Sequence, residues 1–347
     1  MQIGLFTAHD RSLAEALAVW RRAEDVGLDA IGVVDSPLLM REATVALTAL
    51  ALQSSRVRIF PSVMNTLTRD PTVIAGAYLG LRDLAGDRVS LAFGAGDSST
   101  AGVGLGSARL DHIAEFITTV RALVRGERAE YQGRTLQGAW HAWDGVEPRI
   151  LMSAHGPKAL AAAGRVADGV ISGFGLLPET VAAAERIVRE SAERAGRDPS
   201  AVELWHVAYY CPAETVQEGF VHANGGGAAV LARGGGLDGK LVPAHLQAAV
   251  QAVGETWTLE THARANHRAL EVATATGSLD YLVQRAGGLI GPVDLGAGLA
   301  DIEALGVERL LVVALGSDKM RLVGGIGEAL ATRSRRDTDD AARTGVL

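Results

Sequence analysis

The chain of 347 residues has little cysteine, no long apolar run and few aromatic side chains, which make up 5% of it. The single cysteine, Cys211, excludes an intrachain disulfide framework and a cysteine-rich zinc site. A membrane span needs about 20 consecutive apolar residues, so we expect no membrane association. The N-terminal sequence MQIGLFTAHD has neither a basic region nor a long apolar stretch. We therefore expect no secretory signal, and a reduced, soluble, cytoplasmic protein.

An excess of positive charge is also missing. Lys and Arg number 33 against 40 for Asp and Glu, a net charge of −7. Non-specific nucleic-acid binding needs a basic surface, so we expect no nucleic-acid partner. The hydrophobic share of 48% excludes a largely disordered chain. Glycine is abundant, with 42 residues, and many glycines with few aromatics favour tight strand-to-helix turns over a β-sandwich.

Short apolar runs alternate with amphipathic stretches along the chain. The runs predict strands over 2–6, 29–34, 57–63, 88–93, 149–153, 169–172, 202–211 and 309–315. The amphipathic stretches predict helices over 12–26, 42–53, 71–84, 110–125, 157–166, 178–195 and 318–331. Parallel neighbours need crossover connections, and eight such strands can close into a (β/α)8 TIM barrel.

The main alternative to the barrel is an open doubly wound sheet. Against it, Thr7-Ala8-His9-Asp10 follows the first strand where a glycine-rich phosphate loop would stand. The stretch 213–276 breaks the strand–helix rhythm, and only a piece around 245–253 looks helical. We predict one barrel domain over 1–332, with an insertion at about 213–276 between strands seven and eight, and a polar, frayed tail over 333–347.

Small and polar residues follow most of the predicted strands, at the end where a barrel keeps its active site. Each of them also has a purely structural interpretation as a helix cap or a tight turn. No metal site is predicted: His262 and His267 are five apart on an expected helix and do not share a face. The strand-end residues are His9, Asp35-Ser36, 62–65, 94–98, 153–156 and 172–175, with His206 and Tyr209 or Tyr210 on strand seven.

Five segments together give a more specific indication. They are AEDVGLDAIGVVD (23–35), VMNTLTRDP (63–71), DRVSLAFGAGDS (87–98), SAHGPKALAAAGRVADGVI (153–171) and ATGSLDYL (275–282). In the order and spacing of these five segments, the chain resembles the bacterial luciferase-like superfamily. Within it, the chain resembles the branch that uses the deazaflavin coenzyme F420, the methylenetetrahydromethanopterin reductases above all. The resemblance implies a barrel with an insertion and a coenzyme ring in its mouth.

The resemblance also implies roles for individual residues. Ser62-Val63 takes the place of a non-prolyl cis peptide that bulges against the ring, and Asp97 and Gly96 fall near the substrate. Ala154, His155 and Gly156 fall where backbone amides meet the coenzyme phosphate, as the start of a helix there would allow. The implied cofactor-binding residues are Asp35, Ser62, Val63, Asn65, Thr66, Gly96, Ala154, His155, Gly156 and Gly173.

One position departs from the family pattern. Relatives often have His directly after the strand-two Asp, where this chain has Ser36. A hydroxyl of ordinary pKa is a poor general base near pH 7. We name Asp97, Ser36 and His9 as the candidate catalytic residues, with His206 as a further candidate to move the proton.

The resemblance leaves three kinds of function open. The first is an oxidoreductase that moves hydride between F420 and a small organic substrate. The acidic coenzyme tail would then need basic residues such as Lys158 or Arg69. The second is an FMN-dependent monooxygenase supplied by a partner flavin reductase, and the third is a binding protein that has lost the coenzyme. By analogy with relatives we expect a homodimer.

Overall fold

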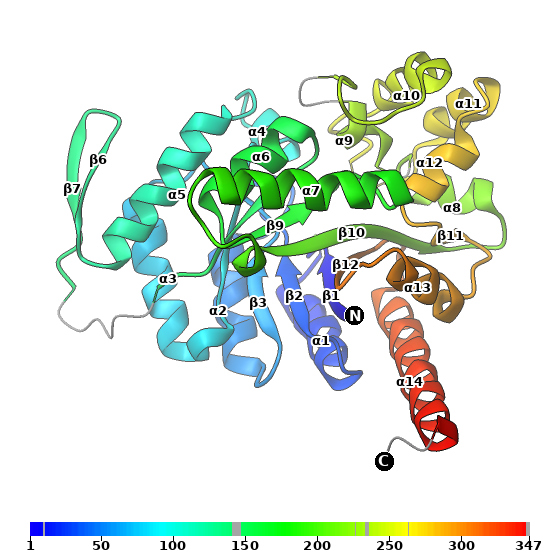
Figure 1. Ribbon diagram of the computed structural model, residues 1–347, viewed down its shortest axis with the longest axis horizontal. Coiled ribbons are helices and arrows are strands. Elements are labelled where there is room, and N and C mark those ends of the chain that lie inside the picture. Colours follow the sequence, from blue (N-terminus) through cyan, green and yellow to red (C-terminus); the bar gives the residue numbers. More distant parts are fainter. Residues whose placement is uncertain (10, 141–146, 226, 233–235, 263, 345–347) are drawn as a thin grey trace.

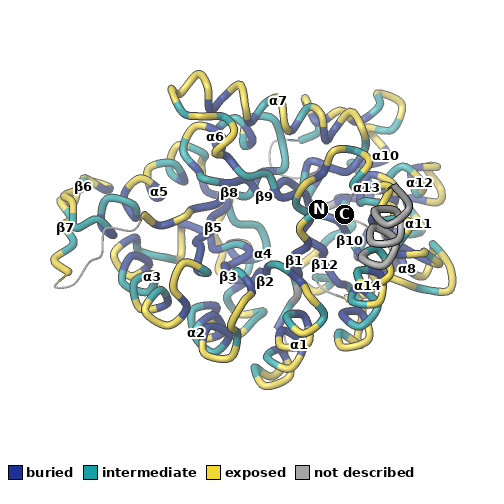
Figure 2. The backbone as a smooth tube through the Cα atoms, turned by 60° about the horizontal axis from the view of Figure 1, so that its bottom comes forward, coloured by how far each residue is buried: buried dark blue, intermediate teal, exposed yellow. Residues whose placement is uncertain are grey.

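The computed structural model describes all residues except 10, 141–146, 226, 233–235, 263 and 345–347. Its centre is a ring of parallel strands, seen end-on in Figure 2, in the order β3-β2-β1-β12-β10-β9-β8-β5-β4. The strands are β1 (Gln2–Thr7), β2 (Ala30–Val33), β3 (Arg58–Pro61), β4 (Met64–Asn65), β5 (Leu91–Gly94), β8 (Ile150–Ala154), β9 (Gly169–Ser172), β10 (Glu203–Pro212) and β12 (Arg309–Ala314).

The ring closes at the third strand position, which the sequence predicted as one strand over 57–63. The chain breaks there into β3 and β4 at a cis peptide between Ser62 and Val63. A parallel bridge from Ile59 to Val89 joins β3 to the segment that enters β5. β3 and β4 therefore share one of eight positions, and the predicted (β/α)8 barrel is confirmed.

The crossover helices begin where the sequence carries helix-start residues. Ser12 and Glu15 form a capping box at the start of the first helix, and Asp70 caps the helix that opens with Pro71. The helices are α1 (Leu13–Asp25), α2 (Ala43–Gln53), α3 (Pro71–Ala85), α4 (Ser98–Ala101), α5 (Leu110–Val124), α6 (Pro157–Val166) and α7 (Pro178–Arg194), with short 3-10 turns η1 (Gly86–Arg88) and η2 (Pro199–Ala201).

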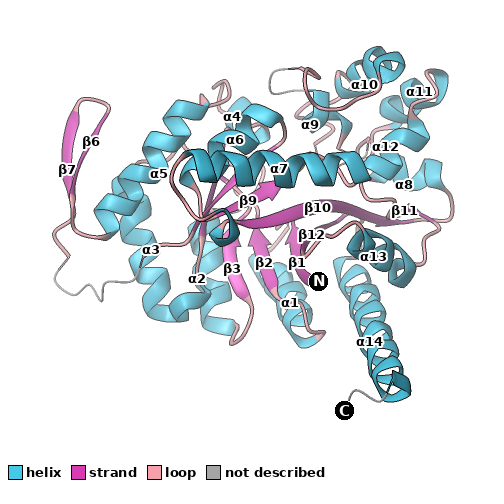
Figure 3. Cartoon of the chain, in the orientation of Figure 1, coloured by secondary structure: helices cyan, strands magenta, loops and turns pink. Residues whose placement is uncertain are grey.

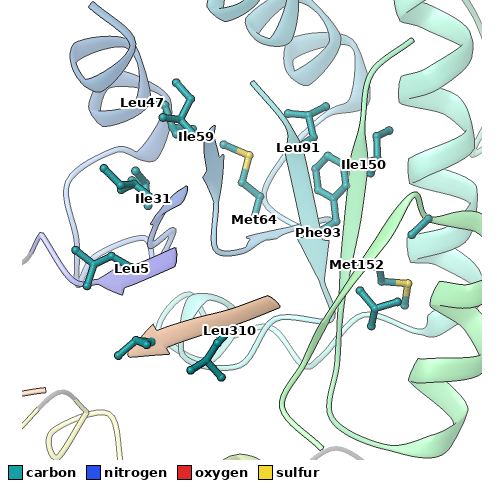
Figure 4. Packing of buried hydrophobic residues seen from close by; sticks show 14 of the residues in the cluster. Leu5, Ile31, Leu47, Ile59, Met64, Leu91, Phe93, Ile150, Met152 and Leu310 are labelled. Atoms are coloured by element: carbon teal, nitrogen blue, oxygen red, sulfur yellow. The ribbon is translucent and has the colours of Figure 1, made fainter. Parts of the chain in front are cut away.

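Most of the core lies between the strands and this shell of helices. Figure 4 shows part of it, where Leu91 and Phe93 of β5 lie beside Ile150 and Met152 of β8. A smaller cluster fills the inside of the barrel and includes Trp205. Successive residues of a strand point to opposite sides of the ring, so these two clusters show which side chains face the barrel axis.

The segment between β10 and β12 contains more helix than the sequence analysis predicted. It forms a unit with a core of its own, built around Phe220, Val250 and Leu282, on one side of the barrel (Figure 1). Its elements are α8 (Val216–His222), α9 (Ala228–Ala232), η3 (Ala244–Leu246), α10 (Gln247–Gly254), α11 (His267–Ala275) and α12 (Leu279–Arg285). The expected shared helix for His262 and His267 is wrong, because α11 begins at His267. The chain returns to the barrel through β11 (Ile290–Gly291), which pairs with the end of β10, and α13 (Leu295–Ala304).

Two further segments differ from the sequence analysis. Part of the segment 126–148, for which no strand or helix was predicted, forms a hairpin of β6 (Arg128–Tyr131) and β7 (Arg134–Gln137) that stands away from the barrel in Figure 3. The polar tail is helical, because α14 runs from Lys319 to Thr344 without a break. The tail contains no proline, and its only glycine comes after Thr344. None of the helices in the described part of the chain is long and apolar enough to cross a membrane.

Candidate active site

The carboxyl ends of the parallel strands open at one end of the barrel, which we call the mouth. Side chains that face the barrel axis there are apolar: Phe6, Val63 and Val207 pack onto the inner cluster and remain partly exposed. The short helix α4 lies across the ring of strands at this end in both Figure 1 and Figure 2. The loops that follow the strands, which carry most of the predicted site residues, are therefore gathered around one opening, with hydrocarbon surface beneath it.

Two glycines keep side chains out of the bottom of the mouth, which we call its floor. A Cβ atom at Gly32 would lie 2.7 Å from Cβ of Ser62, and one at Gly94 would lie 2.7 Å from Cγ2 of Val63. Both distances are far below van der Waals contact, so neither position accepts a side chain without movement of its neighbour. The floor consists of backbone and short side chains, and a flat ligand can approach it closely.

The cis peptide expected from the resemblance is present between Ser62 and Val63. Beside it, Oγ of Ser62 and Oγ1 of Thr66 are buried and have no hydrogen-bond partner among the residues that the structure describes. Buried hydroxyls nearly always have a partner, so these two are free to bond to a ligand. The side chain of the neighbouring Asn65 already has partners. Its Oδ1 accepts hydrogen bonds from the backbone N–H groups of Leu67 and Thr68, and Asn65 therefore stabilises the turn that follows it.

Asp35 is buried at the mouth and is paired with Arg69. Nη2 of Arg69 lies 2.6 Å from Oδ1 of Asp35, and Nη1 lies 2.6 Å from Oε1 of Glu42. Burial raises the pKa of Asp35, and the Arg69 guanidinium opposes that shift. Burial works against the charge of Arg69, but its two carboxylate partners raise its pKa and keep it protonated. Arg69 is therefore engaged in ion pairs within the protein, which argues against the predicted role of Arg69 in binding the acidic tail of the coenzyme.

The position that departs from the family pattern is also buried. Oγ of Ser36 lies 2.8 Å from Oγ of Ser98 at the start of α4, so a pair of hydroxyls joins the loops that follow β2 and β5. Gly96, with φ of 80°, turns the chain into α4, and a Cβ atom there would collide with Thr100. Asp97 follows at the N-cap of α4. The structure thus brings Asp97 and Ser36 to the same part of the mouth.

His9 is buried on the helix side of β1. Its ring packs edge-on against Trp20 of α1 with centroids 5.8 Å apart, and its Nε2 lies 2.9 Å from the carbonyl oxygen of Arg41. Its Nδ1 is buried and has no hydrogen-bond partner in the described part of the chain. Trp20 belongs to the core between strands and helices, so the ring of His9 lies behind the wall of the mouth.

The segment 154–156 leads directly into helix α6, whose first turn has free backbone N–H groups. His155 is partly exposed, its Nε2 bonds Oγ of Ser153, and burial with the nearby charge of Lys240 lowers its pKa to about 4. A Cβ atom at Gly173 would collide with Nδ1 of this ring. His155 and Gly173, predicted to flank the same ligand group, are therefore neighbours.

Lys240 was not predicted as a site residue, although it also lies at the start of α6. Its Cε would be 3.1 Å from a Cβ atom at Gly156, and its Nζ donates to the carbonyl oxygen of Leu231 at 2.8 Å. Burial, with the charge of Arg285 adding to it, lowers the pKa of Lys240 to about 8. An ammonium group beside the positive end of a helix makes this spot attractive to an anion. No sequence signal connects position 240 with position 156, which only the fold brings together.

Strand β10 carries one candidate into the mouth and another away from it. Trp205 and Val207 face the barrel axis, so alternation places His206 toward the helices and Tyr209 toward the mouth. The prediction of His206 as a proton carrier is therefore wrong. Burial, with the charge of Asp97 adding to it, raises the pKa of Tyr209 to about 12. Tyr209 was named only as one of two possibilities on this strand.

The buried Arg285 ties the insertion to the barrel. Its Nη2 donates at 2.6 Å to the carbonyl oxygens of Phe174 and of Lys240, and its Nη1 donates at 2.7 Å to Oη of Tyr281. Arg285 and Tyr209 border a cavity of about 30 Å³ between the insertion and the ends of β9 and β10. This arginine was not predicted, since a lone Arg on a helix gives no signal of its partners.

Comparison with known proteins agrees with this geometry. The family model of the luciferase-like monooxygenases matches residues 1–308. A 5,10-methylenetetrahydromethanopterin reductase of Methanolobus tindarius is 30% identical over 193 residues, which cover 54% of this chain and 58% of that protein. An F420-dependent glucose-6-phosphate dehydrogenase of Beutenbergia cavernae is 34% identical over 174 residues, which cover 45% and 52%. The matches thus span just over half the length of these relatives.

A solved structure extends the likeness in fold to nearly the whole chain. The coenzyme F420 dependent tetrahydromethanopterin reductase from Methanopyrus kandleri superposes with a TM-score of 0.68 at 19% identity, covering 94% of this chain and 97% of that one. At this identity the superposition shows the shared fold. The match of the family model over 308 residues shows more, and the chain belongs to the luciferase-like monooxygenase family.

Proposed function

We propose that this protein is an oxidoreductase that moves hydride between coenzyme F420 and a small organic substrate. The observation that carries the proposal is the floor of the mouth, where Gly32 and Gly94 leave no room for a side chain beside the cis peptide at Ser62-Val63. Such a floor suits a flat tricyclic ring. The choice of F420 is supported by the F420-dependent glucose-6-phosphate dehydrogenase among the relatives in sequence.

The polar groups around the floor fit such a coenzyme. The unpartnered hydroxyls of Ser62 and Thr66 can bond to ring nitrogen and oxygen atoms. The first turn of α6, with Lys240 beside it, can hold a phosphate group. Asp35, which is held in place by its ion pair with Arg69, would lie at the edge of the coenzyme ring. When bound, the deazaflavin would supply a carrier of two electrons in the form of hydride.

The side chains of the mouth would position the substrate and handle its proton. Asp97 is the acidic group that we place nearest the substrate, and Ser36 with Ser98 would hold the loop that carries it. Tyr209 is protonated at neutral pH, and its raised pKa of about 12 extends that state to alkaline pH, so its phenol can donate a hydrogen bond to a substrate oxygen. The apolar Phe6, Val63 and Val207 would limit water in the mouth, which strengthens these interactions.

A binding titration tests the proposal. The purified protein is titrated with oxidised F420 and, separately, with FMN, and the fluorescence of each coenzyme is followed. We expect micromolar affinity for F420 and affinity at least tenfold weaker for FMN. Gly94→Ala should weaken F420 binding because its new methyl group meets Val63, whereas Gly324→Ala, at an open position in α14, should leave it unchanged.

The other outcomes identify the competing functions. Tighter binding of FMN would favour the flavin-dependent monooxygenase and would require a partner reductase. Failure of both coenzymes to bind would contradict the proposal and favour the binding protein. The homodimer predicted from the resemblance is a separate proposal with its own test below.

A further inference from the structure

The end of the barrel opposite the mouth, which we call its base, is lined by charged side chains. It is the end at which the N-terminus lies in Figure 1. Four strands contribute to the apolar cluster inside the barrel with Phe60, Leu151, Trp205 and Leu311. Alternation along a strand places the residue two positions earlier on the same side, toward the barrel axis. These earlier residues are Arg58 of β3, Arg149 directly before β8, Glu203 of β10 and Arg309 of β12.

Glu203 is the one carboxylate in this group, and both of its oxygens are occupied. Nη1 of Arg58 lies 2.6 Å from its Oε2, and Nη2 of Arg149 lies 2.5 Å from its Oε1. Nε1 of Trp205 also donates to Oε2, at 3.2 Å. Burial works against the charge of Glu203, but the two arginines lower its pKa and keep it ionised. Glu203 therefore balances one of the three guanidinium charges.

The arginines of the base have more positive charge and more donors than the protein balances there. Arg309 pairs with Glu308, whose side chain is 77% exposed, and such a pair contributes little. Burial lowers the pKa of Arg58, and the nearby charges of Arg149 and Arg309 act in the same direction. Nη2 of Arg58 and Nε of Arg309 are buried and have no hydrogen-bond partner within the described ranges. Buried donors nearly always have a partner, so the base lacks an acceptor.

A ligand from solvent can reach this group of arginines. The side chains of Arg149 and Arg309 are 46% and 28% exposed. A hollow of about 610 Å³ opens beside Arg309 and also borders Asp29 and Glu303. Those two carboxylates already have partners, since Asp29 accepts the backbone N–H of Ile3 and Glu303 pairs with the N-terminal amine. The unbalanced charge at the base is therefore that of the arginines.

We infer that the base of the barrel binds a small oxyanion that carries two negative charges, a phosphate ion or the phosphate group of a metabolite. Its oxygens would accept hydrogen bonds from Arg149 and Arg309 at the surface and from Arg58 behind them. A charge of −2 would balance the two guanidinium groups that Glu203 leaves over. Guanidinium groups suit such anions because they present planar pairs of donors. The base lies at the opposite end from the coenzyme floor, so this inference does not depend on the proposed function.

The test titrates the full-length protein with inorganic phosphate by calorimetry, at an ionic strength held constant with chloride. It compares wild type with Arg149→Gln, Arg309→Gln and the control Arg189→Gln. Arg189 is a matched control because its side chain is also 46% exposed and pairs with Glu185 on α7. The start of α6 at the mouth is another place for phosphate, so each titration is repeated in the Lys240→Met background. Glycerol 3-phosphate is titrated in parallel.

We expect wild type to bind phosphate with a submillimolar Kd, and Arg189→Gln and Lys240→Met to bind it equally well. Loss of a charge-assisted hydrogen bond should weaken binding at least about tenfold in Arg149→Gln and in Arg309→Gln. Weaker binding of glycerol 3-phosphate than of phosphate would identify the ligand as the free ion, and tighter binding as a phosphorylated metabolite. Both results support an oxyanion site.

Glu203→Gln separates a binding site from a purely structural ion-pair network. It leaves all three guanidinium groups without their buried carboxylate, so phosphate should take over part of its role. We expect saturating phosphate to raise the Tm of wild type by about 2–5 °C, relative to chloride, and that of Glu203→Gln by more. If Glu203→Gln does not fold, the surface variants Arg149→Gln and Arg309→Gln still decide the question.

Three results would overturn the inference. The first is equal phosphate affinity in wild type, Arg149→Gln and Arg309→Gln, or no binding at all. The second is loss of phosphate binding in Lys240→Met alone, which would place the anion at the mouth. The third is a Tm shift in Glu203→Gln no larger than that of wild type. Failure of F420 to bind would contradict the proposed function and leave these results unaffected.

Discussion

Asp35 and Arg69 follow two different strands of the barrel and meet at the mouth, with Nη2 of Arg69 2.6 Å from Oδ1 of Asp35. Their side chains are 3% and 16% exposed, so water screens the pair little. Asp35→Asn leaves the Arg69 charge beside the exposed carboxylate of Glu42. We expect a loss of about 3 kcal/mol in the free energy of unfolding. Urea denaturation measures this loss, and F420 titration of the same variant shows whether the coenzyme site depends on the pair.

Glu42→Gln is the matched control for this prediction. It removes the other carboxylate of Arg69, whose side chain is 45% exposed. An exposed ion pair contributes little, so we expect a loss of about 1 kcal/mol or less. Equal losses in the free energy of unfolding for the two variants would show that burial does not strengthen the ion pair of Asp35 with Arg69.

Gly173 is predicted to be intolerant of any side chain because of its neighbour His155. A methyl group at 173 would collide with the imidazole and displace the segment that enters α6. We expect Gly173→Ala to weaken coenzyme binding at least tenfold, about 1.4 kcal/mol. Fluorescence titration checks it, with Gly80→Ala in α3 as a control, since nothing lies within 4 Å of a methyl group there.

A second substitution tests the cause. The role implied for position 155 is that of a backbone amide, so truncating its side chain should restore the fit. Gly173→Ala combined with His155→Ala is expected to bind the coenzyme more tightly than Gly173→Ala alone. No recovery in the double variant would mean that Gly173 matters for another reason.

Arg285 is predicted to hold the insertion against the barrel. Arg285→Met deprives the carbonyl groups of Phe174 and Lys240 of their donors, at about 1–3 kcal/mol for each group left unsatisfied. We expect amide hydrogen exchange to accelerate in α9 and α12 and to stay slow in β1 and β12. Arg268→Met is the control within the insertion, because Arg268 is 71% exposed and pairs with Glu271 on its own helix. Uniform acceleration across the barrel would contradict a local role.

The ends of the strands could be predicted from the sequence because a small or polar residue follows each apolar run. Asp35, Gly96 and Gly156 directly follow apolar runs, and their common position at the mouth then follows from the barrel itself. The hairpin of β6 and β7 was missed although its two-residue turn, Gln132-Gly133, has positive φ at both positions, as a tight hairpin requires. The surrounding polar residues obscured the strands.

Other features depend on contacts between distant parts of the chain. His206 was misassigned because β10 is apolar on both faces, and its sequence does not show which residues point inward. Trp205 settles this by packing inside the barrel. Lys240 reaches Gly156, and Arg285 reaches Phe174, only after the insertion has folded onto the barrel. No periodicity or spacing in the sequence connects these pairs.

A homodimer is predicted through the outer faces of α2 and α3. Val45 and Leu52 of α2 are 59% and 67% exposed, and Val73 and Leu84 of α3 are 65% and 43% exposed. Apolar helix faces left open to water mark association surfaces. We expect wild type to be dimeric by light scattering, and Val73→Asp with Leu84→Asp to be monomeric with unchanged circular dichroism. A monomeric wild type would contradict the prediction.

His206 and His155 predict a loss of stability in acid. Burial lowers the pKa of His206 to about 4, against an ordinary value of 6.5. Between these two values the unfolded chain binds a proton that the folded protein excludes, so stability falls as the pH drops from about 6.5 to 4. Each pKa unit of difference corresponds to about 1.4 kcal/mol. His155, with a pKa of about 4, adds to the same trend.

His206→Gln separates this contribution from the rest, because glutamine cannot be protonated and His206 lies outside the mouth. We expect the variant to lose less stability than wild type when urea denaturation is repeated at pH 7.0, 6.0 and 5.0. His245→Gln, which removes an exposed histidine, should keep the wild-type pH dependence. If His206→Gln also keeps it, the pKa of His206 does not differ between the folded and the unfolded chain, and the prediction is contradicted.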